Sequence, residues 1–347
     1  MTLDRVPHPS RRGILAAGGA LGAGALLAAC GSGGSDGETG GKSGAGGPWS
    51  FTDDRGTHVK ADGRPKNIVA FTGVAAALHD YGIAVKGVFG PTKTKSGGPD
   101  VQAGDLDVDK VSILGNEWGQ FNLEKYASLA PDLLVSTMFD NSGTLWYVPE
   151  ESKDKILKLA PSVGISVYDR PMTKPLERLL ALAGALGADT GAKKVTDARK
   201  SFEDASARLR KTAKARPEIK VLVGSASQDI FYVSGSHLSA DLEYFKSLGV
   251  NFVEPPESAK KSTGGWYENL SWENVDKYPA DLIMIDNRSS ALQPATLDTS
   301  KPTWRKLPAV AAGQVIPRVT EPIYSYSKCA PILNDLASAI EKAKKVS

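Results

Sequence analysis

Short apolar runs alternate with stretches of helical periodicity along most of the chain. Runs of three to five residues, rich in Val, Ile and Leu and bounded by polar residues, predict buried strands. They lie at residues 67–71, 85–89, 132–136, 165–168, 220–223, 281–285 and 314–316. Residues 74–81, which end before Gly82, predict a helix between the first two runs. Strands separated by helices favour an α/β architecture.

A long amphipathic segment separates the two halves of this pattern. Between residues 190 and 216, apolar side chains recur at steps of three and four, with charged residues elsewhere. This spacing predicts one helix of about 25 residues, nearly 40 Å long. One long helix between two lobes is a stiff connector, so we expect only modest closure around a ligand.

An internal repeat relates the halves. Glu124 and Glu273 are 149 positions apart, and so are Asp132 and Asp281, each of which opens an apolar run. Two residues before each Glu stands a helix-capping residue, so each Glu falls in a first helical turn, where the helix dipole favours it. Two unrelated helix starts are the alternative. The equal spacing favours two related lobes.

The expected organisation is therefore two Rossmann-like lobes joined by one long rigid helix. We expect an N-terminal lobe over residues 49–188, a connecting helix over 189–216 and a C-terminal lobe over 217–347.

The first thirty residues have the order of an export signal. Arg11 and Arg12 precede an apolar run over residues 13–29, which is short and glycine-rich for a permanent membrane span. We expect residues 1–29 to be a signal peptide of the twin-arginine type, with a Sec-type signal as the alternative. The tetrapeptide ending at Cys30 resembles the lipobox of bacterial lipoproteins, which implies that Cys30 carries a lipid.

Residues 30–48 predict a flexible tether behind that cysteine. Nine of the 18 residues from 31 to 48 are glycine, and such a segment buries nothing. The expected location is therefore outside the cell membrane, with the protein anchored by lipid to the outer face of the bacterial cytoplasmic membrane. A lipidated Cys30 leaves Cys329 as the one remaining thiol, so no internal disulfide is expected.

Composition excludes several classes of function. With 42 basic and 39 acidic residues and a formal charge of +3, the chain has no excess of basic residues to bind nucleic acid. Two Cys exclude a disulfide-stapled scaffold, and two Cys with four His disfavour a zinc site, so no direct metal ligation is expected. Residues 49–347 contain neither a G-x-S-x-G nor an H-E-x-x-H motif, and no phosphate-binding loop.

Aromatic residues and a few arginines follow the predicted strands, where α/β proteins bind their ligands. Rings supply contact area and Arg or Tyr donates hydrogen bonds, which suits a bulky, partly apolar ligand with carbonyl oxygens. Arg288 could alternatively form a surface salt bridge. The candidate ligand-binding residues are Phe89, Trp118, Trp146, Tyr147, Arg170, Tyr232, Trp266, Arg288, Tyr324 and Tyr326.

Together these features resemble the iron-siderophore substrate-binding proteins of ABC importers, a group that includes the vitamin B12 binder. The resemblance rests on the lipobox, Asn-Leu-Glu at 122–124 before the strand at 132, the long helix and Ser-Trp-Glu at 271–273. It covers residues 49–343 and implies a class III periplasmic-binding-protein fold, in which a monomer holds its ligand in a shallow cleft between the lobes. It also implies that Glu124 and Glu273 pair with arginines of the membrane permease, and that neither catalysis nor a cofactor is involved.

The number of basic residues in the predicted loops narrows the class of ligand. Binders of the strongly anionic ferric catecholates present several basic residues, whereas the loops here offer only Arg170 and Arg288 prominently. This favours a ferric hydroxamate of the ferrioxamine kind, already chelated when it arrives. Six residues before Glu124, where some hydroxamate binders carry an Arg, stands Trp118, as in the B12 binder.

Two alternatives therefore remain open. One is a cobalamin, haem or catecholate-siderophore binder of the same fold. The other, of a different class, is a lipid-anchored exported enzyme using Asp169 and Asp286.

Overall fold

The computed structural model describes residues 47–347. The expected signal peptide, Cys30 and all but the last two residues of the tether lie outside this range. None of the helices formed by residues 47–347 is both long and apolar enough to cross a bilayer.

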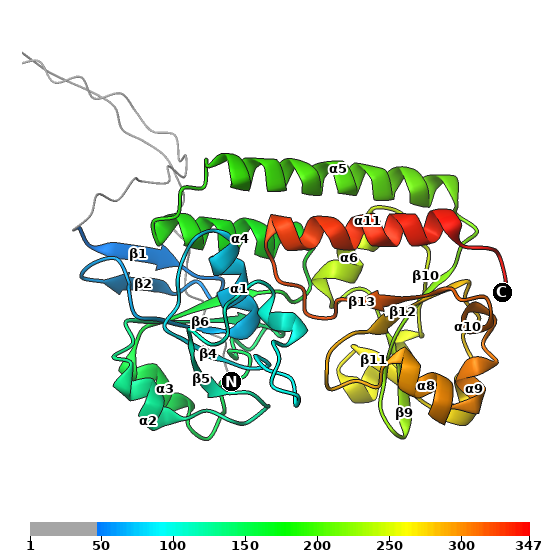
Figure 1. Cartoon of the computed structure of the whole chain (residues 1–347), viewed down its shortest axis with the longest axis horizontal. Helices are drawn as coiled ribbons and strands as arrows, with labels where there is room; N and C mark the ends of the chain where they lie inside the picture. Colours follow the sequence, from blue (N-terminus) through cyan, green and yellow to red (C-terminus); the bar gives the residue numbers. More distant parts are fainter. Residues whose placement is uncertain (1–46) are drawn as a thin grey trace, which may run out of the picture. The chain divides into compact units, whose positions relative to one another are not determined.

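The N-terminal lobe is built on a five-stranded parallel sheet in the order β5-β4-β3-β6-β7. Its central strands β3 and β6 are buried along their whole length, which explains why they are continuous apolar runs. A two-stranded hairpin of β1 and β2 flanks this sheet (Figure 1). The strands are β1 (Trp49–Thr52), β2 (His58–Ala61), β3 (Ile68–Phe71), β4 (Gly87–Phe89), β5 (Ser112–Gly115), β6 (Leu133–Met138) and β7 (Ser162–Ser166), and the helices are α1 (Thr72–Asp80), η1 (Val101–Ala103), α2 (Leu123–Ser128), α3 (Lys153–Leu159) and α4 (Thr173–Ala185).

The C-terminal lobe has its own sheet, in the order β11-β9-β8-β12-β13, with β10 paired to β8. Strands β8, β10, β12 and β13 pair in parallel, whereas β9 pairs antiparallel with both β8 and β11, so the sheet of this lobe is mixed. The strands are β8 (Val221–Ala226), β9 (Ile230–Ser234), β10 (Phe252–Val253), β11 (Tyr267–Ser271), β12 (Leu282–Asp286) and β13 (Val315–Arg318), and the helices are α6 (Ala240–Ser247), α7 (Glu257–Lys260), η2 (Lys261–Thr263), η3 (Trp272–Asn274), α8 (Pro294–Ser300), α9 (Pro302–Arg305) and α10 (Pro308–Ala311). No strand of residues 47–347 belongs to both large sheets.

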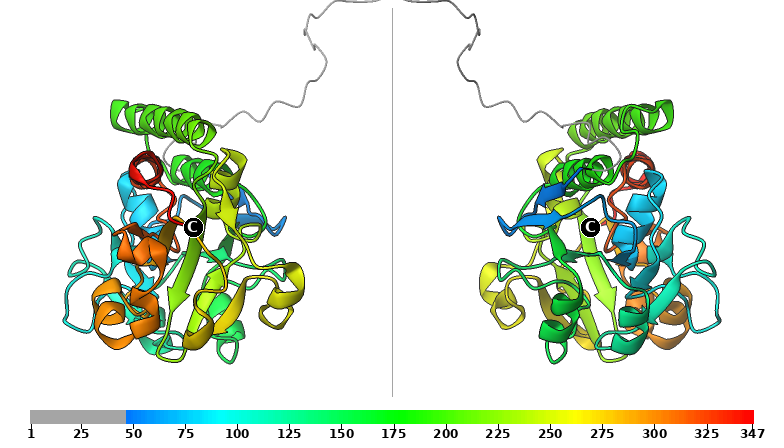
Figure 2. Two further views of the ribbon diagram at one scale, coloured as in Figure 1. Left: turned by 90° about the vertical axis from the view of Figure 1, so that its right-hand side faces the viewer. Right: turned by 90° about the vertical axis from the view of Figure 1, so that its left-hand side faces the viewer.

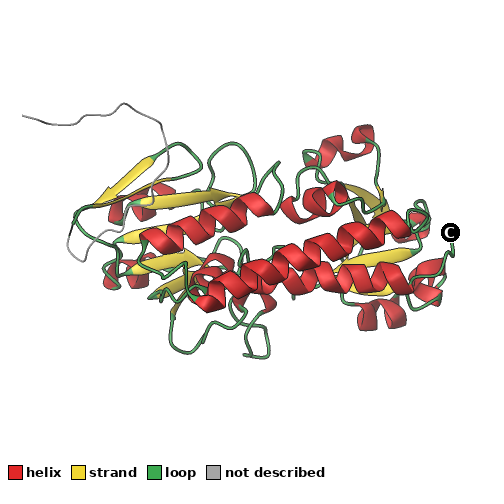
Figure 3. Ribbon diagram, turned by 90° about the horizontal axis from the view of Figure 1, so that it is seen from above, coloured by secondary structure: helices red, strands yellow, loops and turns green. Residues whose placement is uncertain are grey.

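Two packed helices, rather than one, connect the lobes. The expected long helix is α5 (Lys193–Ala215), and α11 (Tyr326–Lys342) runs beside it (Figure 3). Both lie on the same side of the two sheets (Figure 2). Arg208 of α5 donates hydrogen bonds to Asn334, Ser338 and Glu341, which join α5 to the C-terminal half of α11. The connector is therefore stiffer than a single helix.

The repeat has a structural counterpart at the start of a central strand in each sheet. The Asp132 carboxylate accepts hydrogen bonds from the backbone N–H groups of Lys66 and Asn67, just before β3. Asp281 accepts in the same way from Lys220, just before β8. Burial raises the pKa of Asp281, but hydrogen bonds from backbone N–H groups outweigh burial and lower that pKa to about 2. Each carboxylate thus holds two neighbouring strands together where they begin.

The helix starts of the repeat are less alike. Asn122 caps α2 and its side chain accepts from the Lys125 N–H at 2.8 Å. Ser271 precedes only the short 3₁₀ helix η3 and makes no capping hydrogen bond. Glu124 and Glu273 nevertheless both lie in a first turn and are exposed.

Candidate functional site

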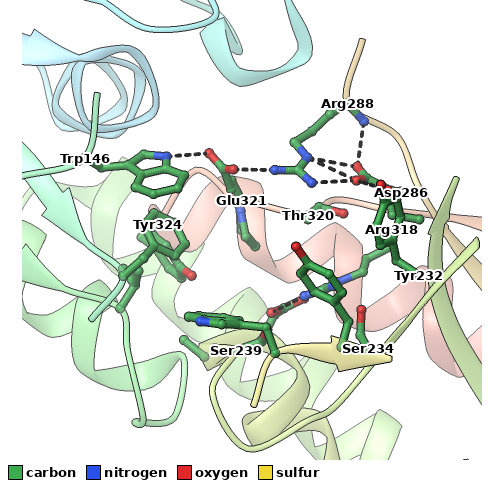
Figure 4. Close-up of a pocket in the computed structure, with 18 of the residues that line it drawn as sticks. Trp146, Tyr232, Ser234, Ser239, Asp286, Arg288, Arg318, Thr320, Glu321 and Tyr324 are labelled. Atoms are coloured by element: carbon green, nitrogen blue, oxygen red, sulfur yellow. Dashed lines mark hydrogen bonds and ion pairs between the residues drawn. The ribbon is translucent and has the colours of Figure 1, made fainter. Parts of the chain in front are cut away.

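A cavity of about 540 Å³ lies between the lobes, at the ends of strands β6, β8, β12 and β13 (Figure 4). The segment 319–325, which leads from β13 to α11, forms part of its wall. The cavity is lined by Phe139, Asp140, Trp146, Val167, Ser225, Tyr232, Ser234, Ser239, Ala240, Asp241, Trp266, Tyr267, Asp286, Arg288, Arg318, Thr320, Glu321, Pro322 and Tyr324. We call it the inner cavity.

A second, outer cavity of about 950 Å³ adjoins it, since Arg288 lines both. Its walls are more polar and include Lys93, Lys95, Trp118 and Tyr147. The Ser289 hydroxyl donates a 2.6 Å hydrogen bond to Asp100 across the lobes at this point.

Aromatic rings form a continuous wall of both cavities. The centroids of Trp118 and Trp146 are 4.7 Å apart, and those of Phe139 and Trp146 are 4.6 Å apart. Trp266, from the C-terminal lobe, approaches Phe139 at 6.4 Å. Trp118 lines the outer cavity and is 63% exposed, the largest exposed fraction among the large apolar side chains of residues 47–347. The wall can therefore take up the apolar surface of a bulky ligand.

Arg288 meets two carboxylates. Its side chain bonds Asp286 at 2.7 Å and Glu321 at 2.6 Å (Figure 4). Burial disfavours the Arg288 cation, but the two acids outweigh burial and raise its pKa. Burial likewise opposes ionisation of Asp286, yet the guanidinium lowers the pKa of that carboxyl. Arg288 thus lines the inner cavity, and its charge is neutralised by two carboxylates of the protein.

A second buried ion pair faces the same cavity. Arg318 and Asp241 form two hydrogen bonds of 3.0 Å, and their side chains are 8% and 4% exposed. Asp241 also lies in the first turn of α6, where the helix dipole favours a negative charge.

The sequence-based candidates divide into three groups. Trp146, Tyr232, Trp266, Arg288 and Tyr324 line the inner cavity. Trp118 and Tyr147 line the outer one.

Three candidates lie elsewhere. Arg170 lines a separate cavity of about 370 Å³ and lies 3.7 Å from Asp54. Phe89 is fully buried against Phe121, because its strand is internal to the sheet. Tyr326 is the first residue of α11, which Ser325 caps, and it packs against Phe202. The structure therefore places Phe89 and Tyr326 in the core rather than in the cleft.

Sequence reasoning missed Asp241, Arg318 and Glu321. Arg318 ends a strand as Arg288 follows one, so its position alone could have indicated it. Nothing local marks Asp241 or Glu321, because their importance comes from arginines 77 and 33 positions away.

Within residues 47–347, there is no group of three or more His, Cys, Asp or Glu side chains that could hold a metal ion. Asp169 and Asp286, the catalytic pair considered for an enzyme, do not both line one of the described cavities. Asp286 is ion-paired with Arg288.

Cys329 is fully buried in α11 and donates to the Ile323 carbonyl at 3.4 Å. Burial raises the pKa of its thiol well above the usual range. In a Cys30→Ser variant, we therefore expect no labelling by a maleimide at neutral pH, and one equivalent after unfolding in guanidinium. Labelling of the native protein at the rate of a free thiol would contradict this placement.

Comparison with known proteins gives the same architecture. Residues 70–317 match the family described as periplasmic binding protein. The crystal structure of DesE, a ferric-siderophore receptor protein from Streptomyces coelicolor, is 70% identical, with a TM-score of 0.85 over 86% of this chain and 100% of that one.

More distant structures share the fold. SirA from Staphylococcus aureus, complexed with staphyloferrin B, is 21% identical, with a TM-score of 0.59 over 85% of this chain and 99% of that one. The FhuD protein from S. pseudintermedius is 20% identical, with a TM-score of 0.55 over 85% and 98%. No curated protein sequence matches the chain.

Proposed function

Because the chain belongs to the periplasmic binding protein family, we propose that it captures a ferric siderophore outside the cytoplasmic membrane and delivers it to an ABC permease for iron uptake. The fold is the class III periplasmic-binding fold, and the family and its solved neighbours are substrate-binding proteins rather than enzymes. The description of DesE as a ferric-siderophore receptor, at 70% identity, supports this ligand class.

The ligand is a ferric hydroxamate of the ferrioxamine type. The observation that carries this proposal is the pairing of the cleft arginines: Arg318 is neutralised by Asp241, and Arg288 by Asp286 and Glu321. A strongly anionic ferric catecholate would need cations with free charge and would meet these buried carboxylates instead. A neutral or cationic trihydroxamate avoids that repulsion, while the aromatic wall contacts its methylene chains and the remaining donors its oxygens.

Titration tests this assignment. We expect ferric hydroxamates to quench tryptophan emission with sub-micromolar affinity, whereas ferric catecholates and cobalamin bind much more weakly. Hydroxamates that leave the emission unchanged, or catecholates that bind more tightly, would refute the ligand class and leave the fold untouched.

The rim residue Trp118 offers a mutational test. Trp118→Ala should weaken binding of a ferric trihydroxamate by about 1–3 kcal/mol, the usual value of an aromatic contact at an interface. The melting temperature should hardly change, because the side chain is 63% exposed. Leu159→Ala, which removes an exposed apolar side chain outside the cleft, is the control. Equal affinities in calorimetry would remove Trp118 from the binding site.

Delivery requires a surface that the permease recognises. We assign this role to Glu124 on α2 and Glu273 on η3, one exposed carboxylate on each lobe. Neither lines a described cavity, so both remain available when a ligand is bound. The protein would be held near the permease by the lipid proposed for Cys30.

A further inference from the structure

Glu321 lies in the segment between β13 and α11, with its side chain only 9% exposed. It connects groups from both lobes. One carboxylate oxygen accepts from Arg288 at 2.6 Å, and the other accepts from the Trp146 indole at 3.3 Å and from Gln102 at 3.0 Å. Figure 4 shows the carboxylate between Trp146 and Arg288.

The surroundings of Glu321 fit its ionised form. Burial raises the pKa of Glu321 above its ordinary value, although Arg288 and the two N–H donors oppose that effect. All three neighbouring groups donate hydrogen bonds, and none offers an acceptor for a carboxyl proton. The ionised carboxylate therefore fits these three hydrogen-bond donors better than the protonated acid does.

Around the inner cavity, the buried carboxylates outnumber the guanidinium groups, so the negative charge of Glu321 is in excess. Arg318 is balanced by Asp241, and Arg288 is balanced by the almost fully buried Asp286. Three buried carboxylates thus face two guanidinium groups. Asp140, the other acid on the cavity wall, is exposed and therefore screened by solvent.

Building on the proposed function, we propose that Glu321 sets the charge selectivity of the cleft. Its excess negative charge favours cationic over neutral and neutral over anionic ferric chelates. In a partly enclosed site, one unit of ligand charge placed within about 10 Å of a carboxylate changes affinity by about tenfold.

The test uses three ferric chelates with one trihydroxamate core: a linear chelate with a protonated amine terminus, its N-acetyl derivative and its N-succinyl derivative. Their tails are cationic, neutral and anionic. Wild-type affinity, measured by calorimetry, should fall in that order. In Glu321→Gln, the ratio of cation to anion affinity should drop by at least about tenfold.

Two variants separate charge from structure. Glu203→Gln removes an equal charge from the exposed face of α5 and should leave the ratio unchanged. Glu321→Asp keeps the charge and should preserve the order. If Glu321→Gln weakens all three chelates equally, Glu321 is merely structural and the proposal is overturned.

The wild-type series is decisive even if Glu321→Gln does not fold. A flat or reversed order among the three chelates overturns the role of Glu321 by itself. If none of the three binds wild-type protein, the proposed function fails instead.

Discussion

Replacing Arg318 by methionine is expected to lower the free energy of unfolding by about 3 kcal/mol. The substitution leaves the Asp241 carboxylate, 4% exposed, without its guanidinium partner. Breaking a buried ion pair costs about 3–5 kcal/mol, because the remaining charge is still desolvated. We expect the lower end of this range, since the pair faces a cavity that water can enter.

Denaturant unfolding followed by tryptophan emission measures this effect. Arg305→Met, which removes an exposed arginine on α9, should change stability by less than about 0.5 kcal/mol. Adding Asp241→Asn to Arg318→Met removes the orphaned charge and should restore at least half of the loss. An Arg318→Met protein as stable as wild type would show that the pair contributes little.

Uptake of iron is expected to fall about tenfold or more when Glu124 and Glu273 are both replaced by alanine, with ligand affinity unchanged. Each carboxylate is exposed on a different lobe, so the two can be engaged together by a partner that spans the cleft. Removing both takes away the charge complementarity that speeds association and orients the complex. Burial and packing of the lobes do not depend on either side chain.

Radioactive iron uptake by cells that express each variant, at limiting ferric chelate, measures this effect. A double variant of Glu203 and Glu218, exposed residues in and after α5, is the matched control. Glu→Asp at both docking positions should retain most of the uptake, because the charges remain. Normal uptake by the double alanine variant would remove the docking role.

The elements predicted best are those whose environment is uniform. Strands β3, β6 and β12 are buried on both faces, so the apolar run in each is visible without knowledge of its neighbours. The helix α5 exposes one face, and its periodicity located it to within three residues at either end. In contrast, β9 alternates between buried and half-buried positions over five residues, too short a pattern to distinguish from a loop. Such strands depend on their pairing partners.

The binding site was partly predictable for a related reason. Residues that follow parallel strands must gather at one edge, so Trp146 and Arg288 could be assigned to the cleft. The prediction that Phe89 and Tyr326 line the cleft was wrong. Whether a strand lies inside a sheet, and at which residue a helix begins, depends on packing against residues far away in the sequence. The partner helix α11 was not foreseen either, and it is what doubles the connector between the lobes.

By itself, the chain's order of residues determined two α/β lobes, the stiff helix between them and a cleft rich in aromatic side chains. These follow from local periodicity and from the rule that parallel strands share one edge. Only the tertiary structure decided which carboxylate neutralises which guanidinium, because Glu321 and Asp241 reach their arginines through space from distant segments. Electrostatic balance in a buried site depends on distance and solvent exclusion, and neither is encoded at any single position.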